Sequence, residues 1–161
     1  MQSSQDVLLQ KCRFSLLASG KALILFSIWT VISASMEVYT LIHQSPEEQS
    51  VSFWAVAGVI LAFNGIDLIL KLIAGFTARA EGRGRYHHSI LIVLGILVAA
   101  LSVYNIISYL PLIPCFYENS GLLRVIITIA VEVTVIYAAL DLVISAVKIR
   151  KLSKETGPQT A

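Results

Sequence analysis

Residues 53–76 read FWAVAGVILAFNGIDLILKLIAGF, an apolar run interrupted by two charges. The run is long enough for a membrane-crossing α-helix, which needs about 20 apolar residues. Asp67 and Lys71 lie four positions apart with the acid first, so they can pair on one helical face. The stretch therefore predicts a transmembrane helix whose polar face points at protein or water and away from lipid.

The rest of the chain repeats this apolar pattern. Of its 161 residues, 57% are hydrophobic and 14% are charged, and the mean hydropathy is +0.79. Soluble domains contain about 25% charged residues. Further apolar runs stand at 22–42, 89–110 and 122–147. The sequence predicts an all-α integral membrane protein, a bundle of four transmembrane helices.

No linker or low-complexity segment divides the chain, so we expect one transmembrane domain over residues 22–147. Residues 1–21 are expected to be a cytoplasmic segment, whose mixed apolar and polar residues also fit a short helix in the membrane plane. Residues 148–161 are expected to be a basic cytoplasmic tail. The small residues at 33–35 mimic a signal-peptide cleavage site, but the apolar run continues past them to Ile42, so we expect no cleavage there.

Positive charges are distributed unequally among the connecting segments. Ten of the 12 Lys and Arg residues precede the first run, separate the second from the third, or follow the fourth: Lys11, Arg13, Lys21, Arg79, Arg83, Arg85, Lys148, Arg150, Lys151 and Lys154. The connectors at 43–52 and 111–121 contain none. Because basic loops stay cytoplasmic, both termini are expected in the cytoplasm, under a plasma membrane or a bacterial inner membrane. The basic side would contact membrane lipids through their anionic headgroups, and it gives no indication of nucleic-acid binding.

Charged side chains also occur inside the apolar runs, at graded depths. From the outer side inward they are Glu37, Glu132, Asp67, Lys71 and Asp141, and Asn64 extends the polar face of the Asp67 pair. Each charge at mid-bilayer costs about 2.5–3.5 kcal/mol on insertion scales, so such residues indicate function or a partner. Glu132 and Asp141 are nine positions apart and therefore lie on opposite faces of one helix. One acid is expected inside the bundle, and the other at a second protomer or at the inner interface.

These residues predict a proton or cation pathway through Glu37, Asn64, Asp67, Lys71, Glu132 and Asp141. Four acids against one base leave a formal charge of −3, which protons or bound cations would compensate. Glu37 shares its face with Thr30 and Ser33, and Asn105 lies at comparable depth, so a polar cluster is expected near the outer side. The protein would act as a homo-oligomer.

Two alternatives remain open at this point. Asp67 and Lys71 can be a packing pair without further chemistry. Alternatively, the charges can dock on another membrane protein, which would make this chain an accessory or assembly subunit. A tandem repeat of two helices is also compatible with the sequence, because VYTLI at 38–42 matches VYNII at 103–107, although apolar helices resemble each other by chance.

Motifs of enzymes and metal sites are absent from the sequence. It contains no CxxC, no HExxH and no phosphate-binding loop, and His43, His87 and His88 all fall in expected connectors. We therefore expect no enzyme, no cofactor and no metal site. Cys12 and Cys115 are expected on opposite sides of the membrane, where they cannot bridge within one chain.

Overall fold

A computed structural model describes residues 4–44, 51–84, 89–112 and 122–155. Within these ranges the chain forms four long helices, α1 (Ser4–Gln44), α2 (Val51–Gly82), α3 (Ile90–Tyr109) and α5 (Leu122–Glu155), and one 3-10 turn, η1 (Leu110–Leu112). Each long helix contains a stretch long and apolar enough to cross a membrane. The prediction of an all-α four-helix bundle with four candidate membrane spans is confirmed.

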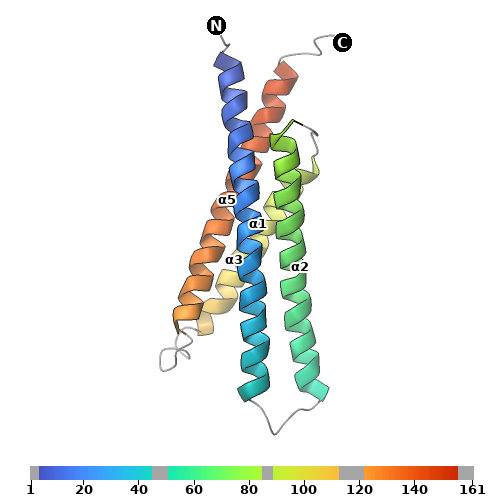
Figure 1. Cartoon of the computed structure of the whole chain (residues 1–161), viewed down its shortest axis with the longest axis vertical. Coiled ribbons are helices and arrows are strands. Elements are labelled where there is room, and N and C mark those ends of the chain that lie inside the picture. Colours follow the sequence, from blue (N-terminus) through green and yellow to red (C-terminus); the bar gives the residue numbers. More distant parts are fainter. Residues whose placement is uncertain (1–3, 45–50, 85–88, 113–121, 156–161) are drawn as a thin grey trace.

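Successive helices run in opposite directions, so α1 begins and α5 ends at the same end of the bundle (Figure 1). We call this the basic end, because it carries Lys11, Arg13, Arg79, Arg83, Lys148, Arg150 and Lys151. The opposite end, where α1 finishes and α5 begins, is the distal end. Figure 1 shows the helices close together toward the basic end, whereas the α1–α2 pair diverges from the α3–α5 pair toward the distal end.

The helices contact one another in the cyclic order α1, α2, α3, α5. α1 packs extensively against both α2 and α5, and α3 packs against α5. The interface between α2 and α3 is the smallest of the four. The bundle therefore consists of two well-packed hairpins, joined firmly by α1 and α5 and loosely by α2 and α3.

The first helix is much longer than the expected run at 22–42. A single helix of 41 residues begins at Ser4, so residues 4–21 are helical and continuous with the run at 22–42. Cys12 and Leu16 are buried in the same cluster as Ala78 of α2 and Ile149 of α5, and this packing explains why the helix continues. At about 1.5 Å per residue, α1 is twice as long as the bilayer core of about 30 Å is thick.

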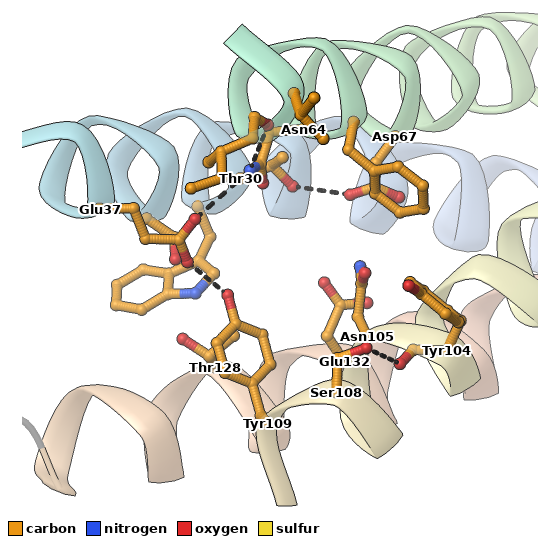
Figure 2. A pocket seen from close by; sticks show the side chains of 15 residues that line it. Thr30, Glu37, Asn64, Asp67, Tyr104, Asn105, Ser108, Tyr109, Thr128 and Glu132 are labelled. Atoms are coloured by element: carbon orange, nitrogen blue, oxygen red, sulfur yellow. Dashed lines mark hydrogen bonds between the residues drawn. The ribbon is translucent and has the colours of Figure 1, made fainter. Parts of the chain in front are cut away.

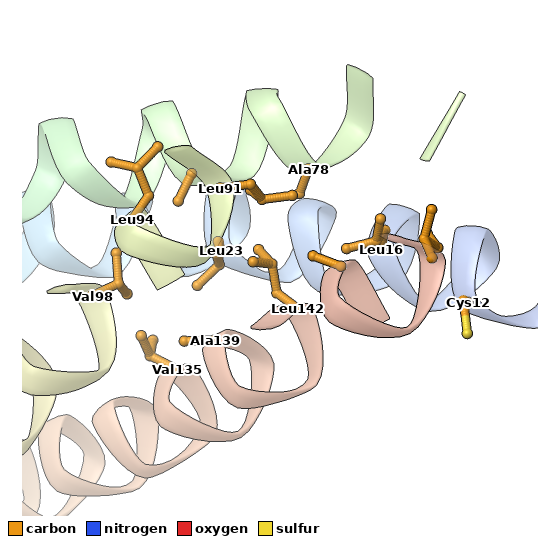
Figure 3. Close-up of a cluster of buried hydrophobic side chains, with 13 residues drawn as sticks. Cys12, Leu16, Leu23, Ala78, Leu91, Leu94, Val98, Val135, Ala139 and Leu142 are labelled. Atoms are coloured by element: carbon orange, nitrogen blue, oxygen red, sulfur yellow. The ribbon is translucent and has the colours of Figure 1, made fainter. Parts of the chain in front are cut away.

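The apolar core occupies the half of the bundle nearer the basic end (Figure 3). Leu23, Leu91, Val98, Val135 and Leu142 are all fully buried there. Large apolar side chains also cover the outside of the bundle, which is the reverse of a soluble protein and suits contact with lipid tails. Those that are at least half exposed include Leu25, Ile28, Val59, Ile69, Phe76, Ile96, Leu123 and Ile144.

Glycines bring α1 and α2 into close contact near the basic end. A Cβ atom added to Gly75 would lie 2.7 Å from Cγ1 of Ile24 and 2.8 Å from the carbonyl oxygen of Gly20. No side chain fits at that position without separating the helices. By contrast, a Cβ on Gly58 or Gly65, nearer the distal end of α2, would meet nothing within 4 Å.

Candidate functional site

The middle of the bundle contains a buried lysine bound to two carboxylates. Lys71 of α2 is completely buried, and its Nζ donates to Oδ2 of Asp67 at 2.7 Å and to Oε1 of Glu132 at 3.0 Å. It also donates to Oγ1 of Thr30 at 3.3 Å. An ammonium group has three protons, so each of them has an acceptor. Asp67 comes from the preceding turn of α2, Thr30 from α1 and Glu132 from α5, so Lys71 joins three helices.

This cluster, formed by Thr30, Asp67, Lys71 and Glu132, is not electrically neutral when all its groups are ionised. Two carboxylates against one ammonium leave a formal charge of −1. Oδ1 of Asp67 and Oε2 of Glu132 are buried and have no hydrogen-bond partner within the described part of the chain. Leaving a buried polar atom unpaired costs about 1–3 kcal/mol, and more for a charged group. The cluster therefore has both the charge and the acceptor atoms to take up a proton or a cation.

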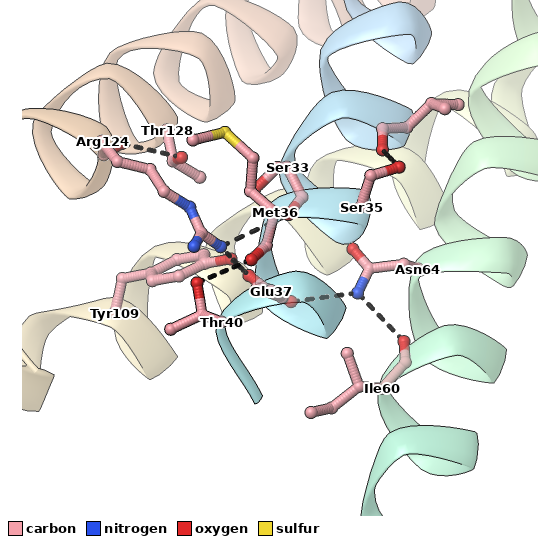
Figure 4. Close-up of polar contacts among 11 residues, drawn as sticks. Ser33, Ser35, Met36, Glu37, Thr40, Ile60, Asn64, Tyr109, Arg124 and Thr128 are labelled. Atoms are coloured by element: carbon pink, nitrogen blue, oxygen red, sulfur yellow. Dashed lines mark hydrogen bonds and ion pairs between the residues drawn. The ribbon is translucent and has the colours of Figure 1, made fainter. Parts of the chain in front are cut away.

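A second polar group, which we call the distal cluster, links all four helices. Its centre is the carboxylate of Glu37 from α1. This carboxylate forms an ion pair with Nη2 of Arg124 from α5 at 3.0 Å. It also accepts hydrogen bonds from Oη of Tyr109 on α3 at 2.5 Å and from Nδ2 of Asn64 on α2 at 3.4 Å. Arg124 also donates to the carbonyl oxygen of Ser33 at 3.3 Å (Figure 4). The side chains of Glu37 and Arg124 are about one-fifth exposed. The charge of Glu37 is thus balanced locally.

We expect Tyr109→Phe to lower the free energy of unfolding by about 1.5 kcal/mol, the lower end for a hydrogen bond to a charged group, because Arg124 still pairs with Glu37. Tyr104→Phe on the same helix is the matched control, since Tyr104 is half exposed. Its change should stay within about 0.5 kcal/mol. Unfolding in mixed micelles, followed by circular dichroism, measures both. Equal losses for the two variants would contradict a stabilising role for the bond to Glu37.

A polar cavity of about 270 Å³ lies between the two clusters (Figure 2). Its walls come from all four helices and include the carboxylates of Glu37, Asp67 and Glu132 and the amides of Asn64 and Asn105. On the basic side of Lys71 the packing becomes apolar, because Leu23, Val98 and Val135 fill the space between the helices. The cavity is therefore a chamber of the distal half with the Lys71 cluster at its inner limit.

The structure brings most of the expected site residues together. Glu37, Asn64, Asp67 and Glu132 all line the cavity, and Lys71 binds two of them. The expected polar cluster near the outer side corresponds to the distal cluster and the adjoining cavity.

Asp141 lies apart from the cavity. It is exposed on the outer surface of α5, where Oδ2 accepts hydrogen bonds from Oγ of Ser19 at 2.6 Å and from the hydroxyl of Ser15. The apolar core, including Ala139 and Leu142, lies on the inner face of the same helix. Glu132 thus faces the interior and Asp141 the outside, as their opposite positions on the helix predict. The expected line of acids is interrupted between them.

Sequence patterns do not identify several residues of the site, among them Trp29, Tyr109 and Arg124. Arg124 pairs with Glu37, and both aromatic residues line the cavity. The available signal was the position of Arg124 in an apolar run on the side where the connectors carry no Lys or Arg.

No protein-family model, curated protein or solved structure gives a significant match to this chain. Among the described residues, no three His, Cys, Asp or Glu side chains are grouped so that they could hold a metal ion. His87, His88 and Cys115 lie outside the described residues. The geometry of the cavity is therefore the basis for the function proposed below.

Proposed function

We propose that this chain moves protons or small monovalent cations across a membrane, with Asp67, Lys71 and Glu132 as its binding site. The observation that carries the proposal is the formal charge of −1 on a buried cluster at the inner limit of a polar cavity. The two unpartnered carboxylate oxygens supply acceptors for the incoming ion. The proposal includes no enzymatic step and no cofactor.

An alternating mechanism fits this arrangement better than a permanently open pore. The ion would enter from the distal cavity and neutralise the cluster. Leu23, Val98 and Val135 would then block its passage to the basic end until the helices rearrange. Because the interface between α2 and α3 is the smallest of the four, separating these two helices would break the least packing. The distal cluster, with Glu37 bound to three other helices, would hold the opposite end together.

The proposal also includes the orientation expected from the charges. The basic end would face the cytoplasm and its anionic lipid headgroups, and the distal cavity would face outward from a plasma membrane or a bacterial inner membrane. The hairpins α1–α2 and α3–α5 would each enter and leave on the cytoplasmic side, as a tandem repeat requires. The proposed working form is a homo-oligomer.

Ion flux in reconstituted liposomes tests the proposal. We expect purified wild-type protein to carry a proton, Na⁺ or K⁺ flux down an imposed gradient. Asp67→Asn and Glu132→Gln should each abolish it, because either change removes the excess negative charge of the cluster. Asp6→Asn is the matched control, since it makes the same change at an exposed residue near the basic end. Its flux should equal that of the wild type.

Two outcomes would change the proposal. If Asp141→Asn also abolishes flux, the path extends beyond the cavity to the outer surface of α5, as the expected series of acids requires. If the inserted, folded wild-type protein gives no more flux than empty liposomes, transport by this chain alone is contradicted.

A second candidate function is that of an accessory or assembly subunit of another membrane protein. It is favoured by Asp141, a carboxylate exposed on the outer surface of the bundle within a candidate membrane span. Its partners Ser15 and Ser19 are neutral, so a charge in that position calls for a cationic side chain from a helix of another protein. Copurification with a different membrane protein, together with absent flux, would support this function.

A further inference from the structure

Beside the polar cavity lies an apolar groove on the outside of the bundle. The groove has a volume of about 520 Å³ and runs between α1 and α2, where Val31, Leu61 and Leu68 line it. Val31 and Leu61 are about half exposed, so the groove opens to the surroundings of the bundle, which are lipid tails in a membrane. Gly65 also lines it and leaves space for a side chain.

The groove and the cavity share part of their walls. Thr30 and Asn64 line both. These two residues therefore form a thin partition between an acidic, polar chamber and an apolar one. Nδ2 of Asn64 donates a long hydrogen bond to Glu37, at 3.4 Å, and a normal one to the carbonyl oxygen of Ile60, at 3.0 Å, so moving the amide aside breaks one ordinary hydrogen bond within α2 and one long one.

The polar chamber has the chemistry to bind an organic ammonium group. Oδ1 of Asp67 and Oε2 of Glu132 are buried acceptors without a partner in the described part of the chain. One monovalent ammonium would cancel the formal charge of −1 and donate to both oxygens. Rings of Trp29, Phe63 and Tyr104 line the same cavity, and the Phe63 and Tyr104 ring centroids are 5.4 Å apart. Aromatic faces attract ammonium groups.

We propose that the cavity takes an amphipathic organic ammonium ion. Its charged group binds between Asp67 and Glu132, and its apolar substituent crosses the partition of Thr30 and Asn64 into the α1–α2 groove. The inference rests on the proposed function, whose cation it specifies. Access from the lipid side, between α1 and α2, follows from the same arrangement.

Calorimetric binding to the purified chain in phosphatidylcholine nanodiscs tests this inference. The probes are pentylammonium, methylammonium and neutral 1-pentanol, with empty nanodiscs subtracted. We expect pentylammonium to bind at least tenfold more tightly than methylammonium, and 1-pentanol to show no saturable binding. Asp67→Asn should remove the binding of both ammonium ions.

A pair of glycine variants separates the groove from the cavity. A Cβ at Gly65 meets nothing within 4 Å, so the leucine of Gly65→Leu fits into the groove and fills it. The affinity for pentylammonium should therefore fall to the affinity for methylammonium. Retained methylammonium binding shows that the variant is folded. Gly58→Leu places the same side chain in open space outside the groove and should leave both affinities unchanged.

Several results would overturn the inference. It fails if methylammonium and pentylammonium bind equally, if 1-pentanol saturates the site, or if Gly65→Leu leaves pentylammonium binding intact. Proton or Na⁺ flux without any ammonium binding would also overturn it, while the proposed function stands. Saturable ammonium binding without flux would support the ammonium site in the cavity and would contradict the proposed transport function.

Two sources of an amphipathic ammonium can be distinguished with the same assay. The phosphatidylcholine headgroup is a quaternary ammonium that cannot donate a hydrogen bond to Asp67 or Glu132, whereas nanodiscs of phosphatidylethanolamine offer the site a primary ammonium on a lipid. Loss of pentylammonium binding in those nanodiscs would identify the ligand as a lipid headgroup. Unchanged binding would identify it as a free amine.

Discussion

Lys71→Met is expected to lower the free energy of unfolding by about 3–5 kcal/mol, the range measured when one partner of a buried ion pair is removed. Methionine has a similar length and fills the space, so the loss comes from charge and not from a cavity. Without the ammonium, Asp67 and Glu132 are two buried carboxylates that share no cation. Reversible unfolding in mixed micelles, or the yield of folded protein, measures the change.

A second variant shows whether charge is the cause. Lys71→Met combined with Asp67→Asn and Glu132→Gln removes the whole ionic cluster while nearly keeping its volume, and it should recover most of the lost stability. Lys148→Met makes the same substitution at an exposed lysine and should change stability by no more than about 0.5 kcal/mol. If the triple variant is as unstable as Lys71→Met alone, the electrostatic explanation is wrong.

Gly75→Leu is expected to destabilise the bundle by about 3 kcal/mol or more, the upper end of the range for overpacking. A Cβ at this position would already lie 2.8 Å from the carbonyl oxygen of Gly20, and a backbone atom cannot rotate away. The variant must therefore separate α1 from α2. The same unfolding assay gives the loss, and distance measurements between spin labels on the two helices give the displacement.

Gly58→Leu on the same helix is the control for this prediction. The added side chain has open space around its Cβ, so stability should change little, or rise slightly because leucine favours a helix more than glycine does. If the two variants lose the same amount of stability, the close contact at Gly75 does not determine the packing of the hairpin.

The fold was largely predictable because the length and spacing of apolar runs are properties of the sequence. The runs at 53–76, 89–110 and 122–147 correspond closely to α2, α3 and the first part of α5. The first run did not reveal the length of α1, because residues 4–21 are too polar to resemble a span. They form a helix whose Cys12 and Leu16 are buried by tertiary contacts with α2 and α5, which no local pattern records.

The site was predictable only within single helices. Spacing placed Asp67 and Lys71 on one face, and it separated Glu132 from Asp141. It could not show that Glu132 completes the Lys71 cluster, because this depends on the rotation and depth of α5 relative to α2. The pairing of Arg124 with Glu37 could not be predicted either, because it depends on the position of α5 relative to α1. Serine partners for Asp141 were missed because residues 15 and 19 were not assigned to the bundle.

The position of Asp67 one turn before Lys71 has a consequence for biosynthesis. When the α1–α2 hairpin emerges from the ribosome, Glu132 has not yet been translated. Lys71 already has an acceptor on its own helix and another in Thr30, so Asp67 and Lys71 can enter the membrane within the hairpin as a neutral ion pair. Glu132 accepts a hydrogen bond from Lys71 only when α5 inserts and packs against α1. The excess negative charge of the Lys71 cluster is therefore acquired only when α5 inserts, after the other three long helices have been translated.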